Sequence, residues 1–165
     1  MRRKLLPAVA AVLLLAAHSP AEQVEFQHVG EMVKLSDLIA RVKIVSVRET
    51  GAKEGYAKIA SVQIAEAFKG GGKGKFFDLE FEAVNFGVPV SCPNVSYAEG
   101  EDVLLFARRL PNGNYHTLYA DAGRFLISEG RLGKRPFRKG QDYESAVAEV
   151  RREVKRLEGL AVSKR

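Results

Sequence analysis

Hydrophobic and polar residues alternate through the middle of the chain, in short blocks that each have the length of a β-strand. In the clearest block, 76–84, apolar residues alternate with Asp78, Glu80 and Glu82. A period of two places these carboxylates on one face of an extended strand and the apolar side chains on the other. The block 56–68 alternates in the same way. Both blocks are therefore predicted to be strands with one face buried and one face in water.

Four further blocks are rich in β-branched or apolar residues and are separated by turn-forming residues: 41–48, 102–110, 115–120 and 123–128. Such side chains fit the pleated surface of a sheet, so each block is predicted to be a strand. Asn112 and Gly113 stand between two of the blocks, and this pair tolerates the positive φ angles of a tight hairpin. The segment 85–100 contains glycine and two prolines, and it is predicted to be a long loop.

The period changes near the C-terminus. After Asp142, which can cap a helix, apolar residues recur at steps of four and three: Tyr143, Val147, Val150, Val154 and Leu157. This spacing predicts an amphipathic helix with a single apolar stripe. We expect the stripe to dock on the strands, although a basic amphipathic helix is also compatible with a membrane surface.

Closely spaced strands joined by hairpins predict a small closed or nearly closed antiparallel barrel, which leaves no exposed sheet edge. The chain divides into an irregular segment, a barrel, a basic loop and the C-terminal helix, at 22–35, 36–130, 131–140 and 141–158. A single domain of this size can bury a core without metal or disulfide bonds.

The first 21 residues have the pattern of a secretory signal peptide, with a basic start, an apolar run and small residues before a cleavage site. Cleavage after Ala21 makes Glu22 the first residue and lowers the net charge from +6 to +3, because Arg2, Arg3 and Lys4 are lost. We expect an exported protein, periplasmic or secreted. No stable membrane anchor is expected, since no other apolar run is long enough to span a bilayer.

The residue types of catalysis and metal binding are present without the spacing that these functions need. His28 and His116 stand far apart and form no metal-ligand pattern. The glycine-rich segment 69–75 lacks the residue order of a phosphate-binding loop and is predicted to be a hairpin loop. Cys92 is the only cysteine, and we interpret it as a small buried apolar residue, with a reactive thiol or an intermolecular bridge as the alternative. We therefore expect no catalytic residue, no metal and no cofactor.

The segment 36–45, S-D-L-I-A-R-V-K-I-V, resembles the first strand of the tissue inhibitors of metalloproteinases. Later segments resemble that family in the same order: 56–70 its second strand, 79–81 its third, Ser91-Cys92 a Val-Cys step in the following loop, and 102–117 its L-I-A-G-K hairpin. The resemblance covers about 36–127 and implies an OB-type five-stranded barrel, the netrin-like fold. The expected fold class is therefore mainly β, a small five-to-six-stranded OB-like antiparallel barrel with a C-terminal α-helix.

The resemblance also implies a binding surface at the mature N-terminus and the loop after the third strand, which here comprises Glu22, Val90, Ser91, Cys92, Pro93 and Asn94. In the family, a free N-terminal cysteine chelates the zinc of the protease. This chain begins instead at Glu22, and Leu35 stands where the family has a cysteine before the S-D-L string. Zinc-directed inhibition is therefore not expected, and we predict a non-enzymatic binding domain with an extracytoplasmic protein as its partner.

Two alternatives remain open at this stage. OB barrels often bind nucleic acid or sugars, and two basic segments could hold a polyanion: 69–75 and the loop residues Arg131, Lys134, Arg135, Arg138 and Lys139. Charge runs are usually only solvated, and few aromatic residues accompany these charges, so nucleic acid is not the expected partner. The second alternative is a hydrolase that uses Asp78, Glu80 or Glu82, although such a row is more typical of a solvated outer face.

Overall fold

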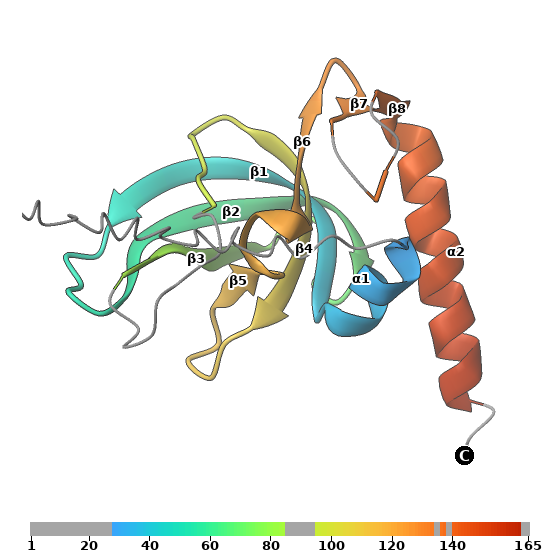
Figure 1. Cartoon of the computed structure of the whole chain (residues 1–165), viewed down its shortest axis with the longest axis horizontal. Coiled ribbons are helices and arrows are strands. Elements are labelled where there is room, and N and C mark those ends of the chain that lie inside the picture. Colours follow the sequence, from blue (N-terminus) through green and yellow to red (C-terminus); the bar gives the residue numbers. More distant parts are fainter. Residues whose placement is uncertain (1–27, 85–94, 134–135, 138–139, 163–165) are drawn as a thin grey trace, which may run out of the picture.

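A computed structural model describes residues 28–84, 95–133, 136–137 and 140–162. The elements follow in the order α1 (Val29–Leu35), β1 (Leu38–Glu49), β2 (Gly55–Lys69), β3 (Phe76–Val84), β4 (Asp102–Arg109), β5 (Tyr115–Thr117), the 3-10 helix η1 (Ala120–Gly123), β6 (Arg124–Ser128), β7 (Arg131–Leu132), β8 (Gln141–Asp142) and α2 (Tyr143–Val162). Figure 1 shows β1 to β5 forming a barrel, with α2 beside it and the short α1 close to α2.

Five strands close into a ring in the order of an OB barrel. β1 pairs with β2 and β4, β2 pairs with β3, and β4 pairs with β5, all antiparallel. The ring closes between β3 and β5 at Leu79↔Tyr115 and Glu80↔His116, and this pairing is parallel. A ring with an odd number of strands cannot reverse direction at every seam, so at least one seam must be parallel. The expected mainly β, OB-like barrel with a C-terminal helix is confirmed.

Two hydrophobic cores lie on opposite faces of β4. Val103, Leu105 and Ala107 belong to the barrel core, together with Leu38, Ala40, Val42, Ile44, Ala60, Val62, Ile64, Leu79, Phe81, Val95 and Tyr97. Leu104 and Phe106 belong to the outer core, together with Val29, Met32, Val33, Ile39, Leu118, Phe125, Leu132, Phe137, Ala146, Val150 and Val154. Both faces of β4 are dry, which explains why its sequence is an unbroken apolar run rather than an alternating one.

Bulges bend β1 and β2 around the barrel. Shifts in their register leave Val45 on β1, and Ala65 and Phe68 on β2, without a residue opposite. A bulge increases the local twist and can turn a side chain to the other face of the sheet. The ring of Phe68 packs against the outer core rather than inside the barrel, so this bulge connects β2 to the helices.

The expectation of an irregular segment before the barrel is wrong for Val29–Leu35, which form α1. Val29, Met32 and Val33 have helical spacing and are buried, but seven residues are too few for a helix that is stable alone. The end of α1 is held from outside: Lys69 Nζ on β2 donates to the carbonyl oxygens of Val33 (2.8 Å) and Ser36 (2.5 Å). A tertiary contact therefore fixes a helix that local sequence signals poorly.

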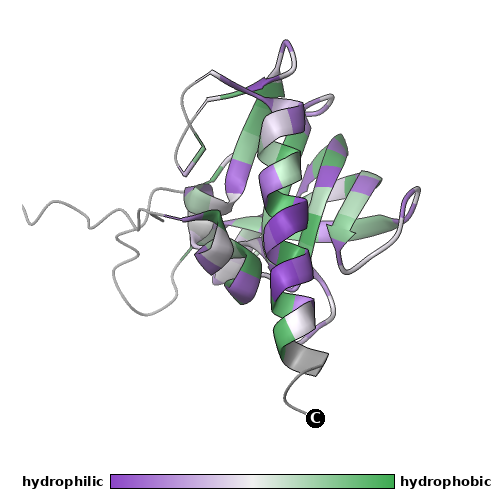
Figure 2. Ribbon diagram, turned by 90° about the vertical axis from the view of Figure 1, so that its right-hand side faces the viewer, coloured by the Kyte–Doolittle hydropathy of each residue, from purple (hydrophilic) through white to green (hydrophobic). Residues whose placement is uncertain are grey.

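The C-terminal helix agrees with its prediction at its start and in its packing. Asp142 Oδ1 accepts a hydrogen bond from the Ser145 N–H at 2.9 Å, as an N-cap does. Val147, Val150 and Val154 are buried, so the apolar stripe docks on the body of the protein. Figure 2 looks onto α2 in front of the strands that it covers. The helix continues to Val162, beyond the expected end at 158.

The segment 131–140 differs from the expected solvated loop. Arg131 and Leu132 pair with Asp142 and Gln141 across the base of the segment. Phe137 is buried in the outer core, where its ring contacts Phe106 and Phe125. A pattern dominated by charge conceals this apolar anchor.

Candidate functional site

The binding surface implied by the resemblance lies outside the described residues, since neither Glu22 nor Val90, Ser91, Cys92, Pro93 and Asn94 falls in the described ranges. The residues that follow this loop are described and are firmly held. Tyr97 is buried, its hydroxyl lies 2.7 Å from that of Thr117, and its ring meets Phe81 edge-on. Burial raises the pKa of Tyr97 above its usual value. The chain that leaves Asn94 is thus anchored where β3 and β5 meet.

An ion pair supports the same anchor. Arg124 Nη2 on β6 lies 2.6 Å from Glu101 Oε1, and the guanidinium stands 5.3 Å from the centre of the Tyr97 ring. Glu101 Oε2 and Arg124 Nε are buried without a hydrogen-bond partner in the described part of the chain. Leaving such atoms unpaired costs free energy, but Glu101 Oε1 and Arg124 Nη2 bind each other, so the ion pair holds β6 to the residue that precedes β4.

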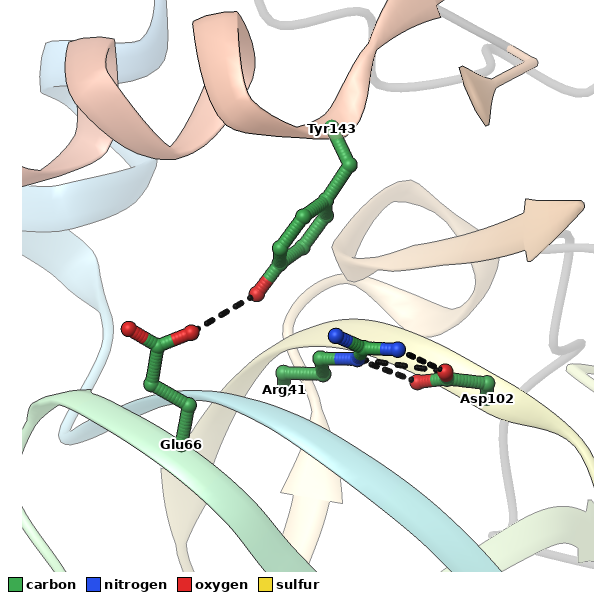
Figure 3. Close-up of polar contacts among 4 residues, drawn as sticks. All are labelled: Arg41, Glu66, Asp102 and Tyr143. Carbon is green, nitrogen blue, oxygen red and sulfur yellow. Dashed lines mark hydrogen bonds and ion pairs between the residues drawn. The ribbon is translucent and has the colours of Figure 1, made fainter. Parts of the chain in front are cut away.

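A polar network joins the barrel to the start of α2 (Figure 3). Arg41 Nε on β1 donates to both oxygens of Asp102 on β4, at 2.9 and 3.1 Å, and its guanidinium carbon lies 5.0 Å from the centre of the Tyr143 ring. The Tyr143 hydroxyl donates to Glu66 on β2 at 3.2 Å, and Arg151 pairs with the other oxygen of Glu66. Each carboxylate thus has a cation or a hydroxyl as its partner.

The environment of this network shifts two pKa values. The hydrogen bond to Asp102 raises the pKa of Arg41 above its usual value. Burial, followed by the charge of Glu66, raises the pKa of Tyr143. Both groups therefore keep their proton at every physiological pH. Neither can act as a general base, because a base must lose its proton near the working pH.

Among the described residues, hollows lie on two sides of α2. One, of about 390 Å³, opens between the network, the β6–β7 turn and the start of α2. The other, of about 440 Å³, opens between α1 and α2. In the second hollow Gly30 leaves room for the end of the Glu153 side chain, because a Cβ there would stand 2.8 Å from Glu153 Oε2. Charges of both signs line this hollow, and two of them, Glu153 and Arg156, form an ion pair along α2 at 2.8 Å.

The acidic row of β3 faces outward as predicted, but its members are paired. Asp78 lies 3.4 Å from Arg48, and Glu82 lies 2.7 Å from Lys58. Glu80 Oε1 accepts hydrogen bonds from the amides of Asn112 (2.8 Å) and Asn114 (2.7 Å) in the β4–β5 turn. The outer face of β2 and β3 is the surface that OB barrels commonly use for oligonucleotides and oligosaccharides. Here its carboxylates would repel a polyanion.

The basic residues of the polyanion alternative are not gathered into one site among the described residues. Lys69 is occupied with the end of α1, while Lys73 and Lys75 are exposed. Arg131 is exposed on β7, and Lys134, Arg135, Arg138 and Lys139 lie outside the described ranges. The described part of the chain brings only two lysines of the 69–75 segment to a free surface.

The described residues contain no group of three or more His, Cys, Asp or Glu side chains that could hold a metal ion. No helix within the same residues is long and apolar enough to cross a membrane. His116 lies on β5 with its ring centre 6.3 Å from that of Tyr56, and His28 is exposed ahead of α1. The two histidines are therefore in different environments, as their sequence contexts predict.

The residues of the network at α2 carry little sign of that role in the sequence. Tyr143 had a signal, because it opens the apolar stripe directly after the capping Asp142. Arg41 and Glu66 had none, since each is a charged residue in a strand and its partner lies more than sixty positions away.

A scan against models of known protein families finds none that matches this chain, and a search of curated proteins finds no similar sequence.

Proposed function

We propose that this chain is an exported, non-enzymatic binding domain of the netrin-like type, and that its partner is an extracytoplasmic protein. One observation carries the proposal: the segments that resemble the metalloproteinase inhibitors coincide with the strands that close the barrel. Segment 36–45 lies at the start of β1, 56–70 on β2, and 102–117 on the β4–β5 hairpin. The segments that carry the resemblance thus lie on strands of the barrel rather than at scattered positions.

The proposed binding surface is the mature N-terminus at Glu22 together with the loop 90–94. The described residue Tyr97 supports this choice, because its buried ring and its contact with Thr117 fix the chain directly after the loop. A loop held on a rigid barrel is a common platform for recognition. The proposal does not include zinc chelation, since the expected first residue is not a cysteine.

The alternative of polyanion binding has less support, because the outer face of β2 and β3 carries carboxylates. Heparin chromatography distinguishes the two. We expect the mature chain to elute below about 0.2 M NaCl, since the carboxylates on the outer face of β2 and β3 oppose the binding of a polyanion. Retention beyond about 0.5 M NaCl, lost in a Lys73→Glu, Lys75→Glu variant, would favour the polyanion instead.

The proposal is tested with the mature chain 22–165 as bait for the exported fraction of the source cells, followed by calorimetry with each purified partner. We expect Ser91→Ala, Asn94→Ala to weaken binding by about tenfold or more, because removal of contacts at the centre of an interface costs over 1 kcal/mol. The control is Ser46→Ala on β1, an exposed serine outside the proposed surface. Full affinity of the loop variant, or an equal loss in the control, would show that the surface is placed wrongly.

A further inference from the structure

The register of β1, β2 and β3 brings a set of side chains together on the outer face of the sheet. Ser61 on β2 lies opposite Ser46 on β1 and opposite Asp78 on β3, while Gln63 on β2 lies opposite Phe76 on β3. Residues opposite each other in an antiparallel pair point to the same face. The residues that alternate with them on β2 and β3 pack in or against the barrel core, so these five side chains point outward.

Phe76 supplies an apolar surface on this outer face. Its side chain is 60% exposed, more than any other large hydrophobic residue in the described part of the chain. The ring gains little from folding, because it stays mostly in water. Polar side chains flank it, so it is not the continuous apolar centre that a protein interface buries. It is a flat apolar platform beside hydrogen-bonding groups.

The hydrogen-bonding groups next to this ring are available to a ligand. The side chains of Ser46, Ser61 and Gln63 reach solvent and make no hydrogen bond within the described residues. Asp78 lies 3.4 Å from the exposed Arg48, so its charge is compensated. A surface of neutral groups and paired charges favours an uncharged polar ligand over a polyanion or a polycation, because neither sign of charge dominates its field.

An uncharged oligosaccharide has the matching chemistry. The hydroxyl groups of a sugar ring donate and accept hydrogen bonds, and the C–H groups on its face pack on an aromatic ring.

We propose that the outer face of β2 and β3, together with Ser46 on β1, binds an uncharged oligosaccharide. Phe76 stacks on one sugar ring, the amide of Gln63 binds the hydroxyls of that ring, and the carboxylate of Asp78 accepts from those of the next. The Cα atoms of Phe76 and Glu80 lie about 13 Å apart along an extended strand, so the face takes a short chain of sugars rather than a single one. These residues are separate from the proposed protein-binding surface, so either proposal can fail alone.

NMR titration of the isotope-labelled mature chain with cellotetraose, maltotetraose and chitotetraose tests the site directly. We expect at least one of these neutral probes to bind with a Kd of about 1 mM or tighter, and to shift the amide signals of 59–63 and 76–80. A heparin tetrasaccharide is the charged comparison, and it should leave these signals unchanged, because Asp78 and Glu80 oppose an anion. No shift with any neutral probe at about 5 mM, shifts confined to other elements, or stronger binding of the heparin probe to this face would overturn the proposal.

Changes at Phe76 isolate the stacking contact. Phe76→Ala should weaken binding of the probe that binds best by about fivefold or more, because the flat apolar surface is lost. Phe76→Tyr keeps the ring and should keep the affinity. The control is Leu126→Ala on β6, which removes another exposed apolar side chain (42% exposed) outside this face. Unchanged affinity in Phe76→Ala, or an equal loss in Leu126→Ala, would show that the ring does not hold the sugar.

Two further variants isolate the hydrogen-bonding groups. Gln63→Ala and Asp78→Ala should each weaken binding of the same probe by about threefold or more, as expected for the loss of one or two hydrogen bonds. Glu158→Ala, which removes an exposed carboxylate from α2, should bind the probe as the unmodified chain does. Full affinity in both Gln63→Ala and Asp78→Ala would show that the ligand does not lie along β2 and β3.

Discussion

The barrel has a covered side, where β1, β4 and the end of β2 pack under the helices, and an open side, where β3 and the rest of β2 meet water. On the covered side, Phe106, Phe125 and Phe137 contact one another and are fully buried. On the open side, Phe76 is 60% exposed and charged residues pair across the strands. One side of the barrel therefore excludes water and contributes to stability. The other side carries charged residues whose interactions are screened by water.

The two sides also differ in how they hold polar groups. On the covered side, Tyr143 and Arg41 join elements that are distant in sequence, and the network fixes α2 to the barrel. On the open side, the pair Lys58–Glu82 joins the neighbouring strands β2 and β3, which already share a ladder of backbone hydrogen bonds. We infer that loss of a side chain matters most where no backbone ladder holds the elements together.

The largest expected effect is Phe106→Ala on the covered side. It should lower the free energy of unfolding by about 3–5 kcal/mol, because removal of a buried aromatic side chain leaves a cavity. Phe76→Ala on the open side should cost less than about 1 kcal/mol, since its ring is already mostly in water. Chemical denaturation measures both, and equal losses would remove the distinction between the two sides.

Gly123→Ala should follow, with a loss of about 1–3 kcal/mol. A Cβ at Gly123 would stand 2.5 Å from the Phe106 carbonyl oxygen and 2.9 Å from the Leu118 backbone, so the backbone on the covered side would have to move. At Gly133 a Cβ would meet nothing within 4 Å. Gly133→Ala should therefore be neutral or slightly stabilising, and thermal unfolding of both variants is the measurement. An unchanged midpoint in Gly123→Ala would contradict the tight packing at η1.

Tyr143→Phe tests the polar network alone, because it removes the hydroxyl that binds Glu66 and keeps the ring. The expected loss is about 1 kcal/mol, typical of one hydrogen bond, and amides of the first turns of α2 should exchange faster. Tyr115→Phe is the matched change on β5, where the hydroxyl makes no hydrogen bond within the described residues and the ring packs on Phe77. The same loss in both variants would mean that the Tyr143 hydroxyl does not fix the helix.

The smallest expected effect is on the open side. Asp78→Asn removes the exposed pair with Arg48, and surface pairs of this kind contribute only about 0–1 kcal/mol. We expect a change in unfolding free energy of less than about 0.5 kcal/mol, smaller still at high salt. A loss above about 2 kcal/mol would show that the open face is a structural network and not a solvated surface.

The strands could be predicted from the sequence, because the pattern of apolar and polar residues in each strand follows from which of its faces is buried. Alternation in 76–84 predicts β3 with its apolar and acidic faces, and the capping Asp142 with its stripe predicts α2. The resemblance added the OB-type order of the strands. The candidate binding loop at 90–94 stays a prediction, because it lies outside the described residues.

Other features depend on partners that no local window contains. α1 is too short to give a clear helical pattern in the sequence, and its end is fixed by Lys69, which lies on β2. The bond between Glu66 and Tyr143 joins residues that periodicity treats as unrelated. In the sequence Phe137 is an apolar residue within a charged loop, and only the tertiary structure shows that it is buried in the outer core.

Local periodicity thus established where the strands and the long helix lie and which faces are apolar, because burial imposes a period of 2.0 or 3.6 on each element. Long-range packing established the rest: the parallel seam between β3 and β5, the two dry faces of β4, and the network at Tyr143. The physical reason is that a hydrophobic pattern records that a face is buried and not what buries it. Which residues bury that face is decided only when distant strands and helices pack together.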